Sequence, residues 1–209
     1  MRPVPPRHVR RAGLLLLGLA LATAAWGYGY QREEDPLLKA FKDALVHARK
    51  GDWDEVARDV EGLRWQVDEL KGDVRVDFSG PLAEAVESRD PQRLAGALAN
   101  LVYLALLQKF HWNDQEAIAD YQKAKARLYS AEVYYVDVLD GNVNRIDRRD
   151  GTRRSERIKE LLRVARKTLG SPGLFGAGSK PADPDAFRAA TGEIRRLLGE
   201  AFPAFVKPE

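Results

Sequence analysis

Few side chains in this sequence could do chemistry, and the histidines are the first to consider. His47 and His111 are the two that lie beyond the N-terminal hydrophobic run, and Glu116 follows His111 five residues later. Imidazole and carboxylate groups on helices hold the metal ions of di-iron bundles, so His111 and Glu116 are the candidate metal ligands. Those bundles use Glu-x-x-His, however, whereas Ala44 and Gln108 stand three residues before the two histidines. A histidine near a helix C-terminus is also stabilised there without a metal.

A second segment resembles a calcium-binding loop only in part. Asp140, Asn142 and Asn144 match the first three ligand positions of an EF-hand. Arg145 occupies the position of the EF-hand glycine, and Gly151 that of its bidentate glutamate. Since Asn, Asp and Gly also favour turns, we expect this string to be a turn and at most a weak cation site.

No arrangement for catalysis can be assembled from the sequence. The chain has no cysteine, which excludes thiolate zinc sites, iron–sulfur clusters and cysteine nucleophiles. The glycine-rich stretch 173–180 is not a phosphate-binding loop, because Ser179 precedes Lys180 and Pro181 follows it. No nucleophile can be paired with a base, so we expect a protein that is not an enzyme and carries no cofactor.

Charge is unevenly distributed along the chain. Residues 25–140 carry 15 bases and 22 acids, whereas residues 141–209 carry 15 bases and 9 acids. Ten of the bases lie between Arg145 and Lys167. Such a surface could dock an acidic partner protein or anionic lipid headgroups, and the alternative is a solvated helix face with charges paired along one helix. The candidate docking residues are Arg145, Arg148, Arg149, Arg153, Arg154 and Arg157.

The N-terminus has the pattern of an export signal. Residues 1–11 are basic and residues 12–30 contain no charged side chain. This order places the N-terminus in the cytoplasm and the chain from about residue 31 on the other side of the membrane. Because four of the arginines belong to this leader, the rest of the chain is almost neutral, which argues against nucleic-acid binding.

Two fates of this leader are open. A small-x-small sequence at 22–24 would let a signal peptidase cut before Ala25. Alternatively, the uncharged run is nearly long enough to span a bilayer as a signal-anchor, a transmembrane helix. Its end carries Trp26, Tyr28 and Tyr30, residue types that lie at membrane interfaces. The first domain is therefore residues 1–30, either a signal peptide or an uncleaved anchor.

Residues 31–209 are predicted to be helical from end to end. Three Asp-Pro pairs, at 35–36, 90–91 and 183–184, have the order of an N-cap followed by a first-turn proline. Further helices are expected at 52–70, 82–88, 113–140 and 154–169, and the helix at 91–112 is apolar on nearly all sides. The fold class is therefore all-α, an antiparallel bundle of about five to seven helices after the hydrophobic leader, with a flexible loop at 171–182.

These features favour binding over catalysis. We expect an accessory, scaffold or binding subunit of a cell-envelope assembly, on the periplasmic side of a bacterial cytoplasmic membrane. It would be anchored if the leader is retained and a soluble periplasmic protein if it is cleaved. A protein partner in the envelope is expected, together with the membrane through residues 12–30 if these are uncleaved. The alternative is a periplasmic metal-binding or metal-delivery bundle that uses His111 and Glu116.

Overall fold

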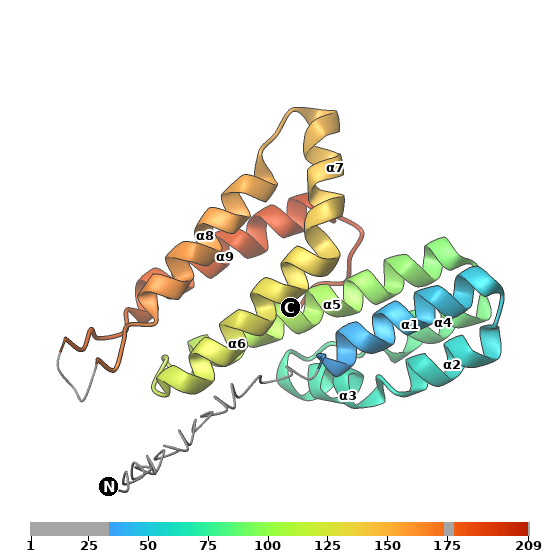
Figure 1. The fold of residues 1–209 in the computed structure, drawn as a ribbon, viewed down its shortest axis with the longest axis horizontal. Coiled ribbons are helices and arrows are strands. Elements are labelled where there is room, and N and C mark those ends of the chain that lie inside the picture. The colour runs from blue at the N-terminus through green and yellow to red at the C-terminus, as the bar shows by residue number, and fades with distance from the viewer. Residues whose placement is uncertain (1–33, 174–177, 209) are drawn as a thin grey trace, which may run out of the picture. The chain divides into compact units, whose positions relative to one another are not determined.

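The computed structural model describes residues 34–173 and 178–208, and these residues are all-α (Figure 1). Within them the backbone forms no strand beyond an isolated antiparallel bridge between Ser171 and Lys180. The predicted leader, with Trp26, Tyr28 and Tyr30, lies outside the described residues. The predicted all-α class is confirmed.

The described helices follow one another with short connections, apart from the longer loop before the last one. They are α1 (Pro36–Lys50), α2 (Trp53–Glu61), α3 (Arg64–Asp73), α4 (Ser79–Glu87), α5 (Pro91–Gln115), α6 (Tyr121–Tyr134), the π-helical segment η1 (Tyr135–Leu139), α7 (Asp140–Asp150), α8 (Arg154–Thr168) and α9 (Pro184–Ala201).

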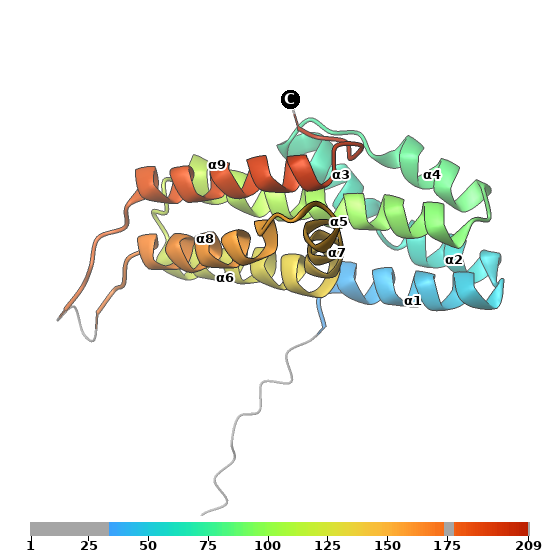
Figure 2. The ribbon, with the colours of Figure 1, turned by 90° about the horizontal axis from the view of Figure 1, so that it is seen from above.

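Helix α5 is the centre of the fold. It contacts α1, α3, α4, α6 and α9, and its side chains from Leu98 to Gln108 are all buried. Figure 2 shows α1, α2 and α4 beside one half of α5, and α6, α8 and α9 beside the other half. A helix that is apolar on all sides must be covered on all sides, which is why the shorter amphipathic helices surround it.

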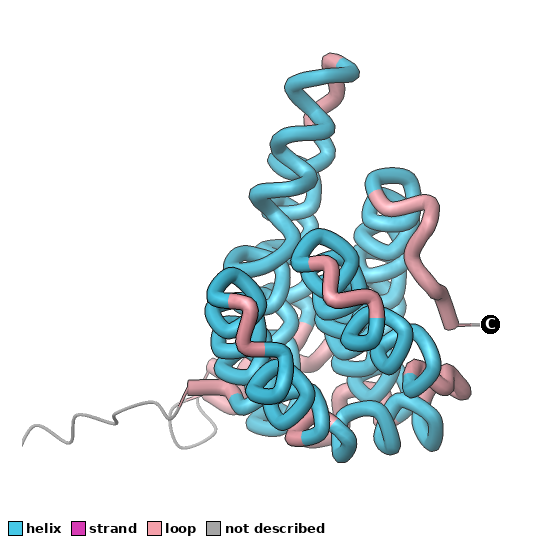
Figure 3. The backbone as a smooth tube through the Cα atoms, turned by 90° about the vertical axis from the view of Figure 1, so that its right-hand side faces the viewer, coloured by secondary structure: helices cyan, strands magenta, loops and turns pink. Residues whose placement is uncertain are grey.

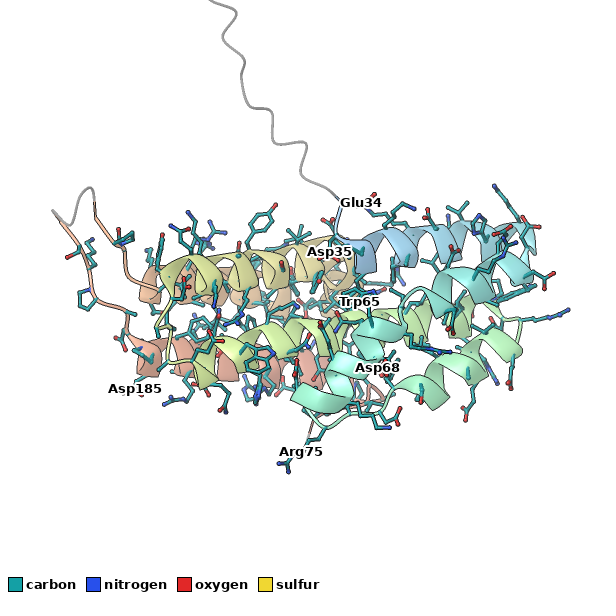
Figure 4. All side chains as sticks on the ribbon, turned by 90° about the horizontal axis from the view of Figure 1, so that it is seen from below. Glu34, Asp35, Trp65, Asp68, Arg75 and Asp185 are labelled. Carbon is teal, nitrogen blue, oxygen red and sulfur yellow. The ribbon has the colours of Figure 1, made fainter. Side chains whose placement is uncertain are left out.

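The Asp-Pro pairs start helices as predicted. The side chain of Asp35 accepts hydrogen bonds from the first-turn N–H groups of α1, and Asp90 and Asp183 cap α5 and α9 in the same way. Asp35 also accepts a hydrogen bond of 2.8 Å from the buried hydroxyl of Tyr134, which ties the start of α1 to the end of α6. Figure 4 labels Asp35 at this end of α1.

The helix predicted at 52–70 is instead two helices, α2 and α3. They are separated at Gly62 and Leu63, where the backbone of Leu63 leaves the helical region. Glycine weakens a helix interior, and the break lets Leu63 be fully buried. Val56 of α2 and Val67 and Leu70 of α3 are buried, so both helices direct an apolar side inward.

The helix predicted to start at Asn113 starts instead at Tyr121. Asn113 does not cap a helix, because its buried amide donates to the carbonyl of Ala124 at 3.0 Å and α5 continues past it. Asp120 is the N-cap of α6. The calcium-like string after Asp140 was predicted to be a turn, and that prediction is wrong, because the chain forms α7 there. Within the described residues the helices are therefore more numerous than the predicted five to seven.

Helix α7 changes direction from α6. The π-helical segment η1 lies between them, and extra backbone inserted in this way bends a helix. In Figures 1 and 3, α7 and its connection to α8 stand away from the helices around α5. One side of α7 is therefore left open to solvent.

Candidate functional site

Three of the predicted docking residues form one exposed face of α7. Arg145, Arg148 and Arg149 are exposed, on the opposite side of the helix from the buried Val143 and Asp147. Within the described residues, no hydrogen bond or ion pair holds any of these three arginine side chains. We call this set the α7 arginine face. It presents three positive charges with no acidic side chain among them.

Arg154 is placed differently from the other predicted docking residues. Its side chain is only 15% exposed and forms ion pairs with Asp147 at 3.1 Å, Asp150 at 2.8 Å and Glu200 at 3.7 Å. Hydrogen bonds from the Thr152 hydroxyl and from Arg154 lower the pKa of Asp150 to about 2. Arg154 therefore joins α7, α8 and α9 instead of presenting its charge to a partner.

The remaining two docking residues are exposed and paired along one helix. Arg153 lies 3.7 Å from Glu156, and Arg157 lies 2.7 Å from Glu160. This pairing is what the solvated-face interpretation expected, although the partners are three residues apart. On the exposed surface of α7 and α8, the unpaired positive charge is thus concentrated on the α7 arginine face and on Arg163 and Lys167.

Beneath the α7 arginine face lies a polar network that sequence reasoning missed. Asp147 is 7% exposed and accepts hydrogen bonds from the Thr152 hydroxyl at 2.6 Å and the Ser155 N–H at 2.8 Å. Asp140 accepts from the Ser155 hydroxyl at 2.6 Å and pairs with Lys159 at 2.6 Å. Burial opposes ionisation of Asp140, but the hydrogen bonds from Lys159 and Ser155 outweigh it and lower its pKa.

This network also explains the calcium-like string. Asp140, Asn142 and Asn144 lie in α7 and not in a loop, and the Asn144 amide donates to the main-chain carbonyl of Asp140 at 3.0 Å. Since the Asp140 carboxylate is engaged by Lys159 and Ser155, it serves to join α7 to α8.

The two candidate metal ligands are not brought together. Both oxygens of the Glu116 carboxylate accept hydrogen bonds from Arg127, at 2.7 and 2.9 Å, which lowers the pKa of Glu116. His111 instead contacts the ring of Trp112 edge-on, with 5.9 Å between the centroids. Across the part of the chain that the structure describes, no three His, Asp or Glu side chains are grouped to hold a metal ion.

His111 lines a cavity that no sequence motif indicated. The cavity has a volume of about 460 Å³ and lies between the end of α3, α5, α9 and the C-terminal segment. The carboxylate of Asp73 at its wall accepts hydrogen bonds from Gln108 at 2.6 Å and from the indole of Trp112 at 2.8 Å. Arg195 lines it from α9 and is exposed.

Asn100 is a third feature that sequence reasoning missed. It is 5% exposed in the apolar α5 and binds the main chain of Val206, donating to its carbonyl at 3.2 Å and accepting from its N–H at 2.8 Å. The ring of Phe205 stacks on Phe202 and lies 5.7 Å from that of Tyr103. The available signal was an amide side chain between apolar residues of the helix, because a buried amide must find a hydrogen-bond partner.

Comparisons with models of protein families, with curated proteins and with solved structures find no match to this chain. Among the helices in the described ranges, none combines the length and apolar character needed to cross a membrane.

Proposed function

We propose that this protein is a non-catalytic docking subunit of a cell-envelope assembly, in which an acidic surface of a partner protein binds the α7 arginine face. The supporting observation is that Arg145, Arg148 and Arg149 are exposed and unpaired among the described residues, whereas the other three candidate docking residues, Arg153, Arg154 and Arg157, are paired with acids of the same chain. An unpaired cluster retains its field for a second molecule, which increases the rate of encounter with an acidic surface.

The network under α7 supports the same proposal. Arg154, Asp147 and Ser155 fix α7 to α8, so the three arginines are held on a rigid element when the partner arrives. A surface that is ordered beforehand loses less conformational entropy on binding. The location in the envelope rests on the predicted leader, and the helical body from residue 34 onward would be an antiparallel bundle held at the membrane or free in the periplasm.

The experiment is reversal of the three charges in the full-length protein. Arg145→Glu, Arg148→Glu and Arg149→Glu together should abolish co-purification of the native partner after cross-linking in cells. Recovery from the wild type should also fall as salt rises, because exposed charges are screened. The matched control reverses Arg75, Arg89 and Arg93, which are exposed and without an ion pair among the described residues. Figure 4 shows the labelled Arg75 pointing away from the helices.

Each outcome separates the proposal from its competitors. Unchanged recovery after reversal of the α7 arginine face would refute the docking role, and equal loss in the control would show a general charge effect. Anionic vesicles are the second ligand to try. If vesicles retain the wild type, lose the α7 variant and prevent partner recovery, the face binds lipid and the partner-protein assignment is wrong.

Metal delivery is not the function we propose. Glu116 is held by Arg127, and no observation places a further ligand beside His111. Elemental analysis of the purified protein after growth with added metals tests this alternative directly. If the wild type contains a stoichiometric metal and the His111→Ala variant does not, the metal-delivery function would be supported.

A further inference from the structure

The C-terminal segment 202–208 crosses α5 and is recognised there through its main chain. Asn100 supplies both an acceptor for the Val206 N–H and a donor for the Val206 carbonyl, while Val206 itself is 38% exposed. Figures 1 and 2 show the segment leaving the end of α9 and passing over α5 toward α3. This pairing would be available to the main chain of any extended peptide, since it does not depend on the side chain at 206.

The surface under this segment is built from two facing rows. On α5, Asn100, Tyr103, Leu107 and His111 follow one another at spacings of three and four residues, which places them on one side of the helix. On α9, Arg195 and Gly199 face the same segment, and the Lys207 ammonium lies 3.5 Å from the Gly199 carbonyl. We call the space between these rows the α5–α9 groove.

The segment fills only part of the α5–α9 groove. A cavity of about 390 Å³ lies on one side, lined by Tyr103, Arg195 and Lys207 among others, and the cavity of about 460 Å³ with His111 lies on the other. Pro208 and Arg195 line both cavities, so the two cavities adjoin each other at the end of the segment. If it moved away, the two cavities would join along α5.

We propose that the α5–α9 groove is a binding site for an extended peptide of a partner protein, and that residues 202–208 occupy it as an intramolecular ligand. The peptide would carry an aromatic residue at the place of Phe205, next to Tyr103, followed by an aliphatic one. Main-chain pairing supplies affinity and side-chain pockets supply specificity in peptide recognition of this kind. This site is separate from the α7 arginine face and does not depend on the docking role proposed above.

Asn100 is the reason why the groove needs an occupant. Its amide is buried, and within the described residues its side chain pairs with the two main-chain groups of Val206. Buried amide groups are destabilising when they lack hydrogen-bond partners. A departing segment must therefore be replaced by water or by another main chain.

The far end of the groove favours an acidic residue in the peptide. Beyond Pro208 the wall includes Arg195 and His111, while the Asp73 carboxylate there is already engaged by Gln108 and Trp112. A carboxylate placed two or three residues after the aliphatic position would reach the guanidinium of Arg195, which has no ion pair among the described residues. The ligand class is thus an aromatic–aliphatic peptide with an acid near its end.

The test uses a fluorescent synthetic peptide with the sequence of residues 201–209 and the full-length protein. A variant designed to release the segment, the released variant, carries Phe205→Ser and Val206→Pro. These substitutions remove the ring beside Tyr103 and the N–H group that donates a hydrogen bond to Asn100. It should bind the peptide at least about tenfold more tightly than the wild type, whose own segment competes at a high effective concentration. A control with Pro203→Ala and Ala204→Ser, two exposed positions, keeps the ring and the main-chain pairing and should behave as the wild type.

Adding Asn100→Leu to the released variant tests whether peptide binding depends on the Asn100 amide. Leucine keeps this position of α5 apolar and removes both hydrogen bonds to Val206. Peptide affinity should fall back to that of the wild type or lower. If the released variant binds no more tightly than the wild type, or if Asn100→Leu leaves the gain intact, the groove is not a peptide site and the proposal is wrong.

A measurement on the wild type keeps the test independent of whether these variants fold. Saturating unlabelled peptide should increase deuterium uptake at residues 202–208 and leave α1 and α2, which do not line the groove, unchanged. Unaltered uptake at 202–208 would mean that the segment is a fixed part of the fold and would overturn the proposal. A wild-type dimer that Asn100→Leu abolishes would assign the groove to a second copy of this chain instead of a partner.

Discussion

Removing the Asp147 carboxylate should separate α7 from α8, and the structure gives the size of the effect. Asp147 accepts hydrogen bonds from Thr152, from the main chain of Ser155 and from Arg154, and its side chain is 8% exposed. Loss of one member of a buried ion pair destabilises a protein by about 3 to 5 kcal/mol, because the partner charge stays buried. Arg154 retains Asp150 and Glu200, so we expect the lower end of this range.

The assay is urea unfolding of Asp147→Ala followed by circular dichroism, together with a thermal melt. A loss of about 3 kcal/mol corresponds to a fall in Tm of roughly 6 to 12 °C for a domain of this size. Hydrogen exchange should show the largest gain in α7 and the start of α8. The matched control is Asp150→Ala, an exposed acid beside the same Arg154, which should cause a much smaller loss.

Two results would refute this reasoning. If the free energy of unfolding of Asp147→Ala is within about 1 kcal/mol of that of the wild type, the network does not stabilise the protein as buried hydrogen bonds to charged groups do. If Asp147→Ala and Asp150→Ala lose equal stability, burial is not the cause. In the docking proposal, Asp147→Ala should also reduce recovery of the partner, although none of the three arginines is changed.

Two further predictions concern titration and the junction of α1 with α6. Hydrogen bonds from Thr152 and Arg154 lower the pKa of Asp150 from 3.8 to about 2, so the stability that its ionised form contributes is present above about pH 3.8 and lost as the pH falls to about 2. An NMR titration of the Asp150 carboxyl should give that low midpoint, and a midpoint near 3.8 would contradict the pairing. Tyr134→Phe removes the hydrogen bond to Asp35 and should lower the free energy of unfolding by about 1 to 2 kcal/mol in urea denaturation. An unchanged free energy would show that the bond does not hold α1 to α6.

The beginnings of helices could be predicted from the sequence because their signals are local. Asp35, Asp90 and Asp183 each bond to N–H groups two or three residues ahead, so the sequence order contains the whole interaction. The central position of α5 was also predictable, since a stretch that is apolar on all sides has no face to present to water.

The helix breaks could not be predicted with the same rules. Asn113 has the side chain of an N-cap, but burial makes its amide bond to the carbonyl of Ala124 instead, and Asp120 caps α6. The charged stretch after Asp140 forms a helix because Val143 and Asp147 pack inward once α8 returns beside it. Tertiary packing overrides local preference at such positions.

The sequence by itself determined where positive charge is concentrated, and only the tertiary structure decided which charges are available. Arg148 and Arg154 lie in the same basic stretch of the sequence and cannot be distinguished there. In the folded chain Arg148 is exposed, whereas Arg154 is enclosed by Asp147, Asp150 and Glu200. The pairing of Asn100 with Val206 joins positions 106 residues apart. Burial and contacts between distant positions exist only when the chain is folded, so no spacing in the sequence contains them.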